Sequence, residues 1–181
     1  MLYVKSDFSN YNVKQKTIKL TMLSLLCALS VVLSAADSMI PAMPFMPPGA
    51  KLGLSNIVTM YTAGFFGLVP ALIIAVVKSL FAGLTRGLMA FLMSFFAGVV
   101  STAVSGLLMI SRKKFFNLIG IGIVGAIVHN LTQLIVAVLI TKTFSLVYYL
   151  PVLIIFALIT GSVTGVVLNI SIQALEKIKA G

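Results

Sequence analysis

The chain has 181 residues, of which 60% are hydrophobic and 9% charged, and its formal net charge is +10. Long uncharged runs in such a composition indicate an integral membrane protein rather than a soluble domain. The chain has one cysteine, one histidine and three acidic residues. An internal disulfide is therefore excluded, and so are a zinc site of several Cys or His residues and a two-metal carboxylate site. We therefore expect no metal and no cofactor.

Six apolar segments are predicted as transmembrane helices, at approximately residues 18–40, 52–69, 70–84, 88–110, 115–140 and 149–175. They make up one transmembrane domain, residues 18–175, between a cytoplasmic N-terminal arm, 1–17, and a cytoplasmic tail, 176–181. The fold class is thus an all-α integral membrane protein. Two alternatives remain open: Ser34-Ala35-Ala36 resembles a signal-peptide cleavage site, and residues 52–77 could form one tilted span.

The distribution of basic residues decides the orientation. With six spans, nine of the 13 basic residues lie on one side of the membrane: Lys5, Lys14, Lys16, Lys19, Arg112, Lys113, Lys114, Lys177 and Lys179. Basic residues concentrate on the cytoplasmic side of membrane proteins. We therefore expect both termini to be cytoplasmic, and the positive charge to reflect topology rather than a nucleic-acid partner.

The connection from Pro41 to Asn56 joins the first two apolar segments and holds four of the six prolines. Proline lacks an N–H group and fixes φ, so a continuous helix is excluded here. The connection also carries the apolar side chains of Met43, Phe45 and Met46, which we interpret as a lid over a ligand site. The alternative is an interfacial turn that rests on lipid headgroups.

Four basic residues fall outside the cytoplasmic group: Lys51, Lys78, Arg86 and Lys142. Lys78 stands out because it lies near the middle of an apolar segment, where a charge costs about 2.5–3.5 kcal/mol on insertion scales. Helical spacing places it on one stripe with Ala71, Ala75 and Ala82, so we expect it to face the helix bundle. The alternative is that Lys78 extends along its own stem to the outer interface.

A second polar cluster lies on the fifth apolar segment. His129 and Gln133 are four residues apart and share a helix face, with Asn130 beside them. Polar side chains at this depth need partners on other helices or in a ligand. Together with Asn56, Lys51, Lys78 and Arg86 they predict an outward-facing pocket for a small anionic or amphipathic molecule. Asp37 could instead pair with Lys51 or Arg86 and weaken that prediction.

Several motifs resemble those of a known family. Pro48–Asn56, His129-Asn130 with Gln133, and Tyr149-Leu150-Pro151 look like the small membrane proteins called heptaprenyl diphosphate synthase component I, also known as the Gx transporter family. The resemblance covers about residues 20 to 175. That family is in turn similar to the S-components of energy-coupling factor (ECF) transporters, which are six-helix substrate-binding subunits of bacterial plasma membranes.

The resemblance implies uptake of a vitamin-like or isoprenoid/quinone-precursor molecule from outside, with an ECF coupling subunit and two ATPases as partners. Ser24 and Ala28 are the nearest match to the small-residue face that contacts the coupling subunit. The label "synthase" suggests another role, as a membrane partner of a prenyl diphosphate synthase. Catalysis by this chain is not expected, because prenyltransferases need aspartate-rich magnesium motifs and no ATP-binding loop is present.

Overall fold

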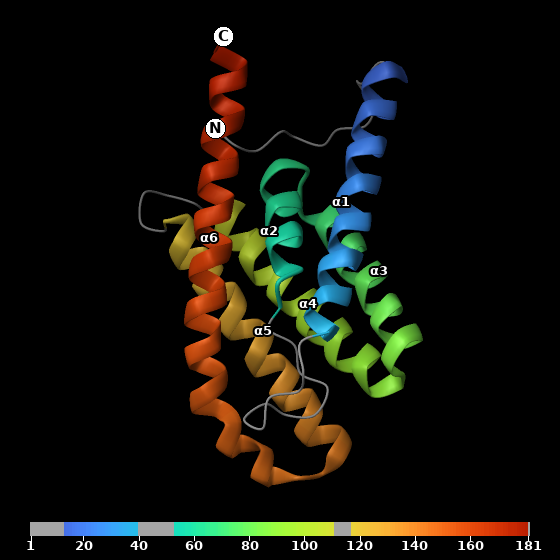
Figure 1. Cartoon of the computed structure of the whole chain (residues 1–181), viewed down its shortest axis with the longest axis vertical. Helices are drawn as coiled ribbons and strands as arrows, with labels where there is room; N and C mark the ends of the chain where they lie inside the picture. The colour runs from blue at the N-terminus through green and yellow to red at the C-terminus, as the bar shows by residue number, and fades with distance from the viewer. Residues whose placement is uncertain (1–12, 40–52, 111–116, 181) are drawn as a thin grey trace.

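The computed structural model describes residues 13–39, 53–110 and 117–180, and within these ranges every regular element is helical. The elements are α1 (Val13–Met39), α2 (Asn56–Phe65), α3 (Leu68–Arg86), α4 (Leu88–Ile110), α5 (Leu118–Thr141), the 3-10 helix η2 (Phe144–Tyr149) and α6 (Leu150–Ala180). They form a bundle in which α2 lies between α1 and α6 (Figure 1). The predicted all-α membrane fold is confirmed.

Five stretches in the described part of the chain are long and apolar enough to cross a membrane: α1, α3, α4, α5 and the run from Phe144 to Ala174. Helix α2 differs, because its 10 residues span about 15 Å, roughly half of a bilayer's hydrocarbon thickness. The predicted segment 52–69 is shorter as a helix because residues 53–55 form a turn before it. Gly67, with φ of 99°, separates it from α3. Residues 53–84 thus form two helices after a turn, rather than one tilted span.

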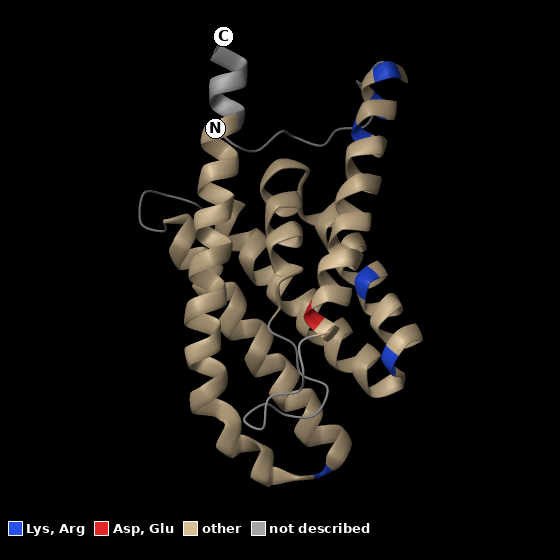
Figure 2. Cartoon of the chain, viewed as in Figure 1, with Lys and Arg blue, Asp and Glu red and all other residues tan. Residues whose placement is uncertain are grey.

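The start of α1 and the end of α6 lie at the same end of the bundle. The N-terminal part of α1 and the C-terminal part of α6 point the same way, and the η2 connection lies at the opposite end (Figure 1). The basic residues of α1 are at the end shared with the C-terminal part of α6 (Figure 2). The positive-inside rule predicts that this end faces the cytoplasm, and the orientation stays a prediction.

Glycines bring α5 and α6 into backbone contact. A methyl group placed on Gly122 would overlap the carbonyl oxygen of Gly161, and one placed on Gly161 would lie 2.5 Å from Cα of Ile123. Small residues permit such close approach where lipid offers no hydrophobic drive for helix association. Glycines on both helices therefore hold α5 and α6 at backbone contact distance.

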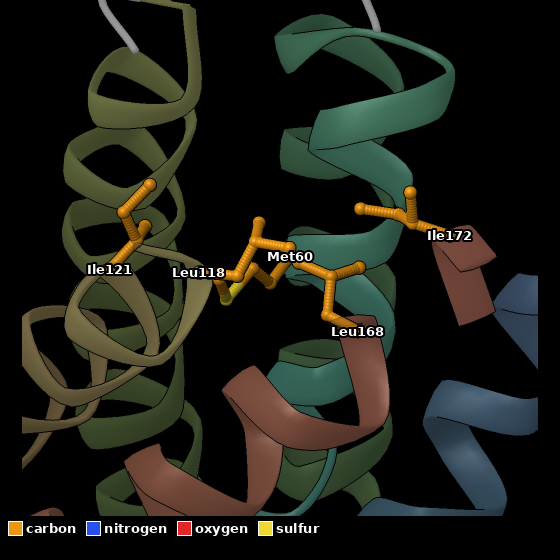
Figure 3. Close-up of a cluster of buried hydrophobic side chains, with 5 residues drawn as sticks. All are labelled: Met60, Leu118, Ile121, Leu168 and Ile172. Atoms are coloured by element: carbon orange, nitrogen blue, oxygen red, sulfur yellow. The ribbon is translucent and has the colours of Figure 1, made fainter. Parts of the chain in front are cut away.

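Two apolar clusters bracket the middle of α5. The first joins Met60 of α2 to α5 and α6 (Figure 3), and its buried members are Met60, Leu118, Ile121, Leu168 and Ile172. The second lies nearer η2, with Met93, Leu134, Ala137, Leu146 and Leu153. Along α5 the polar residues His129 and Gln133 fall between Ile121 and Ala137. A polar layer is therefore enclosed between two apolar ones.

Candidate functional site

The start of α2 is held by a buried carboxylate from α1. Asp37 is 5% exposed, and its Oδ2 accepts hydrogen bonds from the backbone N–H groups of Gly53 (2.9 Å) and Leu54 (3.0 Å). The positive end of a helix dipole favours a negative charge in this position. Gly53 has φ of 84°, a conformation that side-chain-bearing residues rarely adopt. This arrangement fixes where α2 begins.

Lys78 of α3 is buried against the same turn. It is 1% exposed, and its Nζ donates hydrogen bonds to Oγ of Ser55 (3.0 Å) and Oδ1 of Asn56 (2.8 Å). Ala71, Ala75 and Ala82 on the same face are all 0% exposed. The lysine thus faces the bundle, as the spacing predicted, rather than extending to the outer interface.

His129 of α5 is 3% exposed and lies between two polar side chains. Its Nδ1 is 3.3 Å from Oγ of Ser101, and its Nε2 is 3.0 Å from Nε2 of Gln133. Ser101 Oγ itself donates to the carbonyl of Gly98, so it accepts from Nδ1–H. The Gln133 amide then donates to Nε2, which suits a neutral imidazole.

The lysine and histidine groups meet at the α2 turn. A methyl group placed on Gly53 would lie 2.7 Å from Nδ2 of Asn56 and 3.4 Å from Cδ2 of His129. On the other side, one placed on Gly98 would lie 3.4 Å from Cε of Lys78. Residues from α2, α3, α4 and α5 therefore form one buried polar cluster, which we call the α2-turn cluster: Gly53, Ser55, Asn56, Lys78, Ser101, His129 and Gln133.

A small cavity adjoins the cluster. Its volume of about 20 Å³ is room for about one water molecule. Gly53 and Asn56 form one wall. The others come from hydroxyl-bearing residues of α4 and α6, among them Thr102, Ser105, Thr160 and Thr164, and from small residues of α5, Gly122, Gly125 and Ala126. In this conformation the cavity admits no organic ligand.

The hydroxyl groups around the cavity differ in how they are bonded. Thr59, Thr160 and Thr164 each donate to a backbone carbonyl of their own helix and therefore offer lone pairs to their surroundings. Thr102 is 2% exposed, and its Oγ1 has no hydrogen-bond partner among the described residues. A buried hydroxyl without a partner is costly, so Thr102 is a candidate contact for a guest molecule.

The remaining predicted site residues lie elsewhere or outside the described residues. Arg86, at the end of α3, does not line the cavity, but the Asp37 carboxylate is near enough to act on its charge. Asn130 is 3% exposed and donates to the carbonyl of Leu153 (2.9 Å), so it ties α5 to α6. Lys51 and the predicted lid residues fall outside the described residues: Met43, Phe45 and Met46. Among the described residues, no group of three Cys, His, Asp or Glu could hold a metal ion.

Four residues at the site were not predicted from sequence: Asp37, Gly53, Ser55 and Ser101. Asp37 was considered only as an alternative partner of Lys51 or Arg86, whereas the structure shows its carboxylate accepting hydrogen bonds from the backbone of residues 53 and 54. Ser101 belongs to a stripe of small residues on the fourth segment, a pattern that indicates helix packing. Two features of the sequence could have indicated that Ser101 belongs to the site: its three-residue offset from Gly98 and its depth near that of His129. Neither feature is specific, since serines in transmembrane helices usually bond to a carbonyl of their own helix.

The comparisons with known proteins give one match. A family model described as "Heptaprenyl diphosphate synthase component I" matches residues 26–171, which is most of the chain. No curated protein and no solved structure matches it. The matched range includes all residues of the α2-turn cluster.

Proposed function

The chain belongs to the heptaprenyl diphosphate synthase component I family, and on that premise we propose that it is a substrate-binding subunit for uptake of a small anionic molecule. Like an ECF S-component, it would take a vitamin-like or isoprenoid/quinone-precursor molecule from the outer side of a bacterial plasma membrane. The chain itself performs no catalysis in this proposal.

One observation carries the proposal: Lys78 and His129, from different helices, converge on the start of α2 beside a polar cavity. An ionisable side chain buried in a membrane bundle is costly and is usually retained for function. Helix starts near the middle of a membrane bundle are also typical sites for anionic groups of transported molecules, because their N–H groups and dipole favour negative charge.

The charges of the region favour an anion. Asp37 supplies one negative charge, against the positive charges of Lys78 and of Arg86, on which it acts. The sum is one positive charge in excess, which a carboxylate or phosphate group would neutralise. The apolar cluster on the η2 side of the site would suit an apolar body of the same molecule.

Binding requires a change in the α2 turn. The ammonium group of Lys78 donates to Ser55 and Asn56, and the cavity holds about one water. We propose that the anionic group replaces Ser55 and Asn56 at the ammonium, so that α2 shifts when the guest enters. The guest would then gain the hydroxyl of Thr102 as a further donor.

Coupling to ATP hydrolysis would come from partner proteins. In this proposal an ECF coupling subunit with two ATPases contacts α1 at Ser24 and Ala28. Both residues are exposed, and their four-residue spacing puts them on one helix face. Small residues on an exposed helix face allow a partner helix to approach closely.

The test is ligand retention by the purified protein. Native mass spectrometry of detergent-purified protein should reveal one small molecule bound per chain. Lys78→Met and His129→Ala should each weaken its binding tenfold or more, about 1.4 kcal/mol. Lys142→Asn is the matched control, because Lys142 is exposed at the end of α5 with φ of 52°, which asparagine tolerates. Unchanged affinity in both site variants would remove the site assignment.

The family description favours a second candidate, a non-catalytic membrane partner of a prenyl diphosphate synthase. That role predicts co-purification with a soluble, aspartate-rich enzyme, and no small-molecule uptake. A pull-down from native membranes separates the two. Recovery of ATPases and a coupling subunit supports transport, whereas recovery of the soluble synthase without them supports the alternative.

A further inference from the structure

An apolar groove lies on the side of the bundle, away from the α2-turn cluster. Its volume is about 290 Å³. Helix α2 forms its floor with Ile57 and Tyr61, and the flanks are α1 and α6. The flanking side chains include Leu26, Leu29, Val167 and Ser171. Figure 1 shows α1 and α6 on either side of α2.

The groove lies toward the cytoplasmic end of the bundle. Residues 167 and 171 are in the C-terminal half of α6, which points toward the end that carries the basic part of α1 (Figure 2). Ser171 donates its hydroxyl proton to the carbonyl of Val167, so it presents no free donor to the groove. Such a surface in the inner leaflet suits a hydrocarbon chain.

Basic residues stand at the cytoplasmic side of this groove on α1. Lys19 precedes Leu26 by seven residues, which places the two on one helix face about 10 Å apart along the axis. Lys16 and Lys14 lie further from the groove, about 15 and 18 Å from Leu26 along the helix axis. At 100° per residue neither shares a face with the lining: Lys16 is turned about 80° from Leu26, and Lys14 about 60° from Leu29. Lys19 is half-buried while Lys14 and Lys16 are exposed. A long lysine side chain can reach headgroup level from such a position.

We propose that this groove binds one anionic phospholipid of the cytoplasmic leaflet. An acyl chain lies on α2 between α1 and α6, and the headgroup phosphate contacts Lys19. Basic pockets between transmembrane helices on the cytoplasmic side are typical sites for anionic lipid headgroups. The site does not depend on the proposed transport function. It also differs from the face of Ser24 and Ala28, which lie about 140° and 180° around α1 from Lys19.

The experiment measures lipid binding to the full chain in mild detergent. Native mass spectrometry titrates phosphatidylglycerol, and phosphatidylcholine with the same acyl chains, onto the purified protein. We expect one retained phosphatidylglycerol. Lys19→Gln should weaken its binding about fivefold, the effect of one basic residue near a membrane surface. Lys14→Gln is the matched charge control and should leave binding unchanged.

A second pair of variants tests the chain-binding part of the groove. Leu29→Trp fills the groove and should abolish retention, whereas Val32→Trp, at an exposed position (61%) outside the groove lining, should not. Equal binding of the two lipids, or equal loss with Lys14→Gln and Lys19→Gln, would overturn the proposal. So would a stoichiometric partner protein whose capture Leu29→Trp abolishes, since a helix would then occupy the groove. The lysine variants keep the test valid if Leu29→Trp does not fold.

Discussion

Replacement of Asp37 tests whether a single carboxylate sets the start of α2. Asp37→Ala removes the acceptor of two backbone N–H groups, one buried and one partly buried. Hydrogen bonds to a charged group contribute about 1.5–3 kcal/mol each. Because the N–H of Leu54 is only partly buried, we take the low end for both, a total of about 3 kcal/mol.

The assay is thermal unfolding in detergent, followed by circular dichroism. For a chain of this size a loss of about 3 kcal/mol lowers Tm by roughly 6–12 °C. Asp37→Asn keeps one acceptor oxygen without the charge and should lose about half as much. Ser38→Ala is the matched control, because Ser38 only bonds back to the carbonyl of Ser34 and should change stability by less than about 0.5 kcal/mol.

A Tm of Asp37→Ala within about 2 °C of the wild type would refute this role of Asp37, since that shift corresponds to no more than about 1 kcal/mol. A Tm loss as large for Ser38→Ala would also refute it, because any change at this end of α1 would then be destabilising. Equal losses for Asp37→Asn and Asp37→Ala would show that the charge, rather than the acceptor geometry, holds the turn.

Three further predictions follow from close contacts and from the cavity. Gly122→Ala should destabilise the α5–α6 contact by about 1–3 kcal/mol, because the added methyl group meets the carbonyl of Gly161. Gly120→Ala is the control: its methyl group would have no atom within 4 Å, so the change should be neutral or stabilising by up to about 1 kcal/mol. Thermal melts of the two variants compare their stabilities. Thr102→Val should leave Tm unchanged or raise it, since it removes an unsatisfied hydroxyl; a fall of several degrees would show that the hydroxyl is bonded. If the hydroxyl contacts the guest, the same variant should bind the co-purified molecule less tightly, by mass spectrometry. Lys78→Met should retain the fold in circular dichroism but lose ligand, and loss of both would indicate a structural role only.

The buried glycines and Lys78 show how far local patterns reach. The four-residue spacing of Gly161 and Gly165 is typical of close helix packing, and the alanine stripe around Lys78 predicted that this lysine faces inward. Both patterns need only the periodicity of one helix. The spacing of Asn130, in contrast, placed it beside His129 but did not reveal that its amide bonds to Leu153, because that partner belongs to another helix.

Composition and the lengths of the apolar segments determined the membrane class of this protein, and the positions of basic residues predict its orientation, because the cost of placing charge and backbone in hydrocarbon is set residue by residue. The tertiary structure decided that α2 is a half-length helix, that Asp37 holds its first turn, and that Lys78 and His129 meet at that turn. These features depend on contacts between residues 16 to 76 positions apart along the chain, and such contacts follow from which helices are neighbours, a property that no single segment encodes.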